Sequence, residues 1–156
     1  MDKIKWCLKA KNGLELVEPD KDLSDAYLKK AEGSLMAAFA LKGNRDWEIS
    51  SSYYTMYFSL YAILIKIGIK CEIHSCTISF MQHFLKEYFT AEDIELIEKS
   101  QKARIDAQYY SDRNVSDDLY KRIIKSPPLF LAKCKEVLHH INEDSIKQIR
   151  GDLNAY

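Results

Sequence analysis

A long apolar stretch near the middle of the chain, residues 47–67, constrains the fold more than any other feature. Its large apolar side chains recur every three or four residues in two strips, which is the period of an α-helix. A helix that is apolar on two sides is covered on two sides. The stretch therefore predicts the central helix of an all-α protein, with Asp46 as its N-cap and Gly68 as its left-handed end.

A narrow band of small and polar residues separates the two apolar strips. At about 100° per residue its members fall within one quadrant of the helix: Ser51, Thr55, Ser59, Ala62 and Lys66. Small side chains let another helix approach closely, and that helix belongs either to the same chain or to a second copy. The band is one reason to expect a symmetric homodimer.

The rest of the sequence predicts further amphipathic helices separated by short breaks, with no strand pattern. These helices are expected over 3–11, 22–42, 76–89, about 91–110, 117–125 and 143–153, and Pro127-Pro128 either starts another helix or kinks the one before it. Short connections make neighbouring helices antiparallel. We expect one domain, residues 1–156, folded as an up-and-down antiparallel bundle of about five main helices.

Charge and hydropathy limit the partners. The chain carries 23 Lys and Arg residues and 23 Asp and Glu residues, and zero net charge argues against a broad, nonspecific grip on nucleic acid. The sequence begins without an apolar signal region, and the uncharged part of the central helix falls short of the roughly 20 residues that span a bilayer. We therefore expect a cytoplasmic protein without membrane contact, and its four cysteines as free thiols.

Arg104 is the most informative charged residue, because its predicted helix places it on an otherwise apolar face with two amides, Gln101 and Gln108. An ionised group is seldom buried without a partner. In one interpretation Arg104 binds a phosphate of a nucleotide or of RNA, which a guanidinium matches bidentately. In the other it forms a structural ion pair with a carboxylate of a neighbouring helix. Both interpretations are open at this point.

Three potential metal ligands lie within six residues: Cys71, His74 and Cys76. A structural zinc site needs a fourth ligand, and zinc modules use better separated ligand pairs. We therefore expect no metal site and no cofactor, with the cysteines packed as small apolar residues. A Gly-rich phosphate loop and the common hydrolase motifs are absent.

Two segments resemble the signature of the HEPN domain family, the small helical domains found beside minimal nucleotidyltransferases. The first, YYTMYFSLYAILIKIGIKCEIHSCTISFM, matches at Tyr53, Tyr54, Met56, Gly68 and His74. The second, RIDAQYY at 104–110, resembles the Arg-x-x-Ala-Asp-Tyr motif of one subgroup. The N-terminal segment 6–32 extends the resemblance to nearly the whole chain.

The resemblance implies a homodimer and a nucleotidyltransferase-domain partner, often as a toxin–antitoxin pair acting on RNA. Ribonuclease members carry a His four to six residues after the motif arginine, and the two groups are thought to handle the 2′-hydroxyl and the scissile phosphate. Here Gln108, Tyr109 and Tyr110 follow Arg104 at that spacing, and the next histidine is His139. The first hypothesis is therefore a nucleotide- or RNA-associated protein with a degenerate nuclease site.

Two alternatives stay open, and with them whether the protein is an enzyme. One is an active, metal-independent endoribonuclease toxin that uses Arg104 with His74 or Tyr109. The other is a purely structural module that binds the nucleotidyltransferase. The candidate residues are, for catalysis, Arg104, Tyr109 and His74, and for nucleotide or RNA binding, Arg104, Gln108, Tyr110 and Tyr54.

Overall fold

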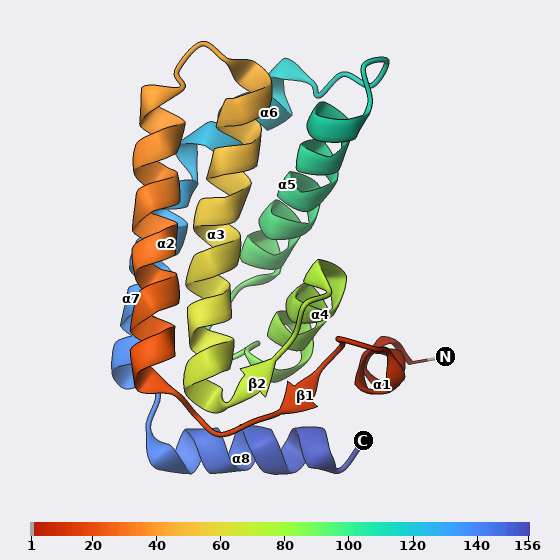
Figure 1. The fold of residues 1–156 in the computed structure, drawn as a ribbon, viewed down its shortest axis with the longest axis vertical. Helices are drawn as coiled ribbons and strands as arrows, with labels where there is room; N and C mark the ends of the chain where they lie inside the picture. Colours follow the sequence, from red (N-terminus) through yellow and green to blue (C-terminus); the bar gives the residue numbers. More distant parts are fainter. Residues whose placement is uncertain (1) are drawn as a thin grey trace.

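A computed structural model describes residues 2–156 and shows an all-α fold, as predicted (Figure 1). The described chain forms eight helices and two very short strands. In order they are α1 (Lys3–Lys9), β1 (Glu15–Leu16), α2 (Lys21–Ala40), α3 (Arg45–Ile67), β2 (Ile69–Lys70), α4 (His74–Phe84), α5 (Ala91–Tyr109), α6 (Asp117–Lys125), α7 (Pro127–His140) and α8 (Glu143–Asn154).

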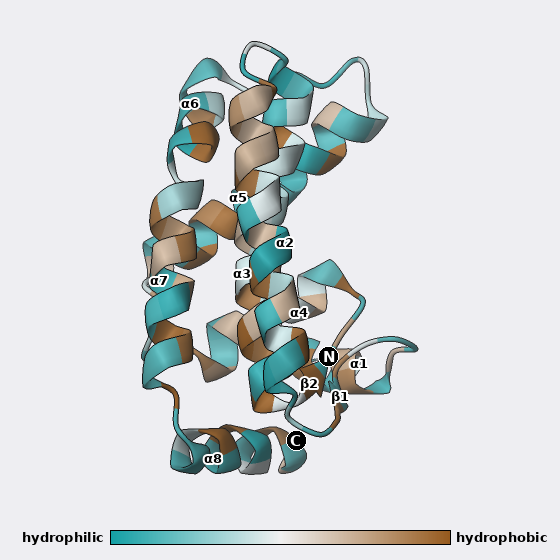
Figure 2. Ribbon diagram, turned by 60° about the vertical axis from the view of Figure 1, so that its left-hand side comes forward, coloured by the Kyte–Doolittle hydropathy of each residue, from teal (hydrophilic) through white to brown (hydrophobic). Residues whose placement is uncertain are grey.

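Helix α3 is the centre of the bundle. It packs against α2, α5, α6 and α7, and Figure 1 shows α2 running antiparallel beside it. Its apolar side chains form much of the core, and several of them are completely buried: Tyr53, Met56, Leu60, Ile63, Leu64 and Ile67. In Figure 2 hydrophilic and hydrophobic stretches alternate along outer helices such as α7, as expected for helices with one buried face. No helix within residues 2–156 is both long and apolar enough to cross a membrane.

Helices of the same chain cover the band of small residues on α3. Thr55, Ser59 and Ala62 are fully buried. The Ser24 hydroxyl of α2 donates a hydrogen bond to the Ala62 carbonyl at 2.6 Å, and the Lys66 ammonium bonds a carbonyl of α7. Close approach of a helix to this band is therefore explained within one chain, and a homodimer would have to use another surface.

The ends of α3 agree in part with the ends predicted from the sequence. Gly68 ends the helix in the left-handed conformation, with φ 89° and ψ 43°, as predicted. The start lies earlier than expected, because Asn44 is the N-cap residue and Asp46 lies in the first turn. Trp47, the first large apolar residue of the predicted helix, is 55% exposed.

A two-residue antiparallel ribbon joins β1 to β2, with Glu15 opposite Lys70 and Leu16 opposite Ile69. The sequence predicts no strand, because two residues are too few to show an alternating pattern. Arg150 of α8 also holds this region in place. Its Nη1 donates hydrogen bonds to the carbonyls of Val17 and Gly68 at 2.7 and 2.8 Å. Helix α8 lies crosswise at this end of the bundle (Figures 1 and 2).

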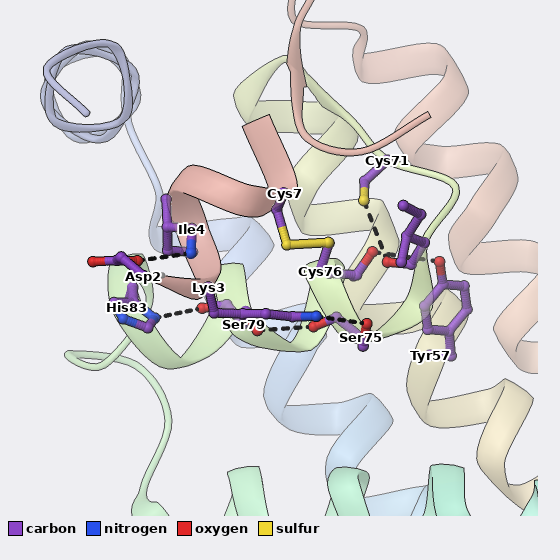
Figure 3. Close-up of a disulfide and its surroundings, with 12 residues drawn as sticks. Asp2, Lys3, Ile4, Cys7, Tyr57, Cys71, Ser75, Cys76, Ser79 and His83 are labelled. Carbon is purple, nitrogen blue, oxygen red and sulfur yellow. Dashed lines mark hydrogen bonds between the residues drawn. A yellow bond between two sulfur atoms is a disulfide. The ribbon is translucent and has the colours of Figure 1, made fainter. Parts of the chain in front are cut away.

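A disulfide joins Cys7 of α1 to Cys76 of α4 across 69 positions of sequence (Figure 3). The expectation of four free thiols is therefore wrong for these two residues, whereas Cys71 and Cys134 are free and buried. The expectation assumed a reducing compartment, and the sequence does not show how close two cysteines lie in the fold. The fold brings the two Cα atoms to 5.7 Å, within the range that a disulfide spans.

Candidate functional site

The candidate site lies where α3, α4 and α5 meet. His74 is the first residue of α4, and its ring lies against the tyrosines of α3. The Tyr53 hydroxyl and His74 Nδ1 share a hydrogen bond of 2.7 Å, and the Tyr57 ring stacks on the imidazole with centroids 3.9 Å apart. Helix α3 thus holds the imidazole both by a polar bond and by ring stacking.

Arg104 of α5 contacts Tyr53 and its neighbour Tyr54. Its guanidinium carbon lies 5.2 Å from the Tyr53 ring centroid and 5.6 Å from that of Tyr54. Its Nη1 donates to Gln108 Oε1 at 3.3 Å. The side chain is buried, with 9% of the residue's surface exposed. Tyr53 therefore contacts both Arg104 and His74.

No carboxylate compensates the Arg104 guanidinium among the described residues, whose ion pairs all involve other cations. Its Nε is buried and has no hydrogen-bond partner. The structural ion pair, one of the two interpretations of Arg104, is therefore wrong for this fold. A buried cation without an anion is costly unless a ligand supplies one.

The surroundings of His74 favour its neutral form. Burial and, second, the positive charge of Arg104 lower the pKa of His74 from 6.5 to about 4. Burial also raises the pKa of the Tyr53 hydroxyl, which stays a phenol. At neutral pH Arg104 is therefore the only charged group of this cluster.

The lowered pKa of His74 predicts that the protein loses stability in mild acid. Between pH 6.5 and about 4 the unfolded chain binds a proton at this histidine and the folded chain does not. The stabilising contribution is thus complete above pH 6.5 and is lost as the pH falls. Urea unfolding between pH 7 and pH 4 measures it, and we expect His74→Gln to show a flatter pH dependence than the wild type. Equal slopes would contradict the pKa of His74.

Two of the predicted site residues lie away from this cluster. Tyr109 is 67% exposed at the end of α5. Tyr110 follows the helix, and the Arg113 guanidinium covers its ring at 3.7 Å. Five residues after Arg104, Tyr109 has turned away from the Arg104 face of the helix, and Tyr110 lies beyond the end of the helix in an extended conformation. The structure thus brings together Arg104, His74, Tyr54 and Gln108, and leaves out Tyr109 and Tyr110.

The sequence interpretation gave no role at the site to Tyr57, which stacks on His74. Tyr53, Tyr57 and Tyr61 follow one another at intervals of four, and their rings stack at 5.8 and 5.9 Å. That spacing is a visible signal, because residues four apart lie on one helix face. It does not show which of the rings meets a histidine of another helix.

The Cys71, His74 and Cys76 segment forms no metal centre in the described part of the chain. The Cys76 sulfur is bonded to Cys7, and His74 Nδ1 is hydrogen-bonded to Tyr53. Within residues 2–156 no three side chains of His, Cys, Asp or Glu cluster as a metal would require.

The HEPN domain family model matches residues 24–137, from the first turn of α2 to the last turn of α7. The chain belongs to the HEPN domain family. The matched part includes every residue of the Arg104 and His74 cluster, and membership supports an association with nucleotides or RNA in general. No curated protein sequence matches the chain.

Proposed function

We propose that this HEPN protein binds RNA or a nucleotide through the Arg104 cluster and that its nuclease site is degenerate. The observation that carries the proposal is the buried Arg104 guanidinium, which has an unpartnered Nε and no carboxylate. A phosphate supplies the missing negative charge and accepts two parallel hydrogen bonds from the guanidinium fork. The tyrosine rings beside it offer faces for a base.

Weak or absent cleavage follows from the proton chemistry of the cluster. No histidine follows Arg104 on its own helix, and Tyr109 lies outside the cluster. The remaining imidazole, His74, has a pKa near 4, which makes it a poor proton carrier at neutral pH. An active, metal-independent endoribonuclease is the second candidate, because Tyr53 contacts both His74 and Arg104.

We also propose a homodimer with a nucleotidyltransferase-domain partner in a toxin–antitoxin-like pair. The support is the family together with the segment from Arg104 to Tyr110, which resembles one subgroup's motif. The cytoplasm stays the proposed location, although the bond between Cys7 and Cys76 removes the argument from free thiols. The unpaired Arg104 makes a purely structural role of the domain the weaker alternative.

Replacing Arg104 by Ala tests the binding function. We expect the variant to lose RNA binding while its free energy of unfolding changes by about 1 kcal/mol or less, because the contacts removed are ring contacts and one long hydrogen bond to the exposed Gln108. Breaking a buried ion pair would instead cost about 3–5 kcal/mol. Fluorescence anisotropy with labelled RNA and no added metal measures binding, and urea unfolding measures stability.

Two control variants sharpen this experiment. Lys102→Ala removes one positive charge from the exposed face of the same helix, and we expect it to bind RNA as the wild type does. Arg104→Lys keeps the charge and loses the fork, so binding should be weakened and not abolished. Unchanged binding by Arg104→Ala would refute the proposed site. Robust cleavage that Arg104→Ala and His74→Ala both abolish would establish the active nuclease.

A further inference from the structure

A second cation lies over aromatic rings on the α2 side of the site. Lys30 Nζ is 5.2 Å from the Phe58 ring centroid and 5.8 Å from that of Tyr27. The lysine ion pairs of the described chain all use other residues. Lys30 thus shares two properties with Arg104: it contacts rings of α3 and has no carboxylate partner.

Stacked rings connect the two cations. Tyr54 and Phe58 lie four residues apart on α3, and their centroids are 5.4 Å apart with planes inclined by 23°. Tyr54 contacts Arg104 and Phe58 contacts Lys30, while Tyr27 of α2 lies 6.1 Å from Phe58. The three rings, here called the aromatic strip, are partly buried against the core. The strip therefore runs from Arg104 to Lys30 with exposed ring surface between them.

Partly exposed aromatic rings with a cation at each end fit a chain of alternating planar and anionic groups. Unpaired RNA is such a chain, because its bases stack on aromatic side chains while its phosphates pair with cations. In duplex RNA the bases are stacked inside the helix and cannot reach the rings. A second copy of this protein would bring the same two cations, and the strip holds no carboxylate to pair with them.

We propose that Lys30, Phe58 and Tyr27 form an additional subsite for single-stranded RNA, next to the Arg104 cluster. The inference rests on the proposed RNA binding and extends it to a second phosphate and a second stacking position. It also predicts the path of the bound RNA, which crosses α3 from the α5 side to the α2 side.

Binding of single-stranded RNA to strip variants tests the subsite. Phe58→Leu keeps an apolar side chain and removes the ring, and we expect it to bind a labelled single strand about tenfold more weakly. Lys30→Gln should reduce the slope of log Kd against log salt by about 0.7, the single-strand value for one phosphate contact. Lys30→Arg should restore the slope. Wild type should bind the single strand more tightly than the duplex of the same sequence.

Matched controls separate this inference from the proposed function. Lys29→Gln removes the same charge from the neighbouring position of α2, and Phe39→Leu removes a ring that is 62% exposed near the end of that helix. Both should bind RNA as the wild type does. If Arg104→Ala abolishes binding but Phe58→Leu and Lys30→Gln bind normally, or if duplex binds as well as single strand, the subsite is refuted and the Arg104 site stands.

Oligomeric state completes the test. Light scattering on each variant shows whether the strip is instead a contact between two copies. Weakened RNA binding at an unchanged molecular mass supports the subsite. A Phe58→Leu variant that changes mass and keeps its RNA affinity overturns it in favour of a dimer contact. A wild type that binds no RNA overturns both the subsite and the proposed function.

Discussion

Reducing the Cys7–Cys76 disulfide is expected to lower the free energy of unfolding by about 4 kcal/mol. The bond closes a loop across 69 residues, and a loop of this size removes about that much conformational entropy from the unfolded chain. For a protein of this length the corresponding fall in Tm is about 10 °C. Urea unfolding with and without dithiothreitol measures the change.

The loss of stability on reduction should begin at the junction of α1 and α4. Figure 3 shows the bridge between these helices, with the Lys3 ammonium bonded to the Ser75 hydroxyl beside it at 3.3 Å. His74 lies two residues before Cys76, so the disulfide also fixes the turn that presents the imidazole to Tyr53. Apart from the disulfide, the N-terminal segment is held by the buried side chains of Ile4 in α1 and of Leu14 beyond it, and by backbone hydrogen bonds such as that from Glu72 to Asn12.

A double variant, Cys7→Ala with Cys76→Ala, serves as the control, because its stability should not respond to dithiothreitol. Thiol titration of the denatured, unreduced wild type should find two free thiols, Cys71 and Cys134. Four free thiols and no response to reductant would show that the bond is absent and that the original expectation from the sequence was right.

Gly68→Ala is expected to lower the free energy of unfolding by about 3–5 kcal/mol. Gly68 has φ 89°, which costs an L-residue about 1–2 kcal/mol. A Cβ there would lie 2.5 Å from the Val17 carbonyl oxygen and 2.2 Å from Arg150 Nη1. The methyl group would therefore displace Arg150, whose charged hydrogen bonds to the partly buried carbonyls of Val17 and Gly68 are each worth about 1.5–3 kcal/mol.

Gly33→Ala is the matched control for this substitution. Gly33 lies inside α2, and a Cβ there meets no atom within 4 Å. Alanine in an exposed helix interior should stabilise the fold by about 0.5–1 kcal/mol. Urea unfolding of both variants should give shifts of opposite sign. A Gly68→Ala protein as stable as the wild type would contradict the close approach of Val17 and Arg150 to this glycine.

Local sequence patterns determined the helices. The three-to-four residue period of 47–67 specifies a helix covered on two sides, and Thr90 with Asp93 forms a capping box where α5 starts. Gly68 ends α3 as its sequence position predicts. These features depend on neighbours within one or two turns, and such neighbours are visible in the sequence. For the same reason Arg104 stands out from the sequence as a cation on an apolar helix face.

Only the tertiary structure decided which side chains meet. His74 and Arg104 are thirty positions apart and come together because α4 and α5 pack on the same part of α3. Tyr109, near Arg104 in sequence, turns away because five residues carry it past the shared helix face. The Cys7–Cys76 bond, the β1–β2 ribbon and the place of Lys30 beside Phe58 depend on chain separations that no local period encodes. The sequence thus specifies which side chains lie on each face of a helix. The packing of the helices specifies which residues of other helices those side chains contact.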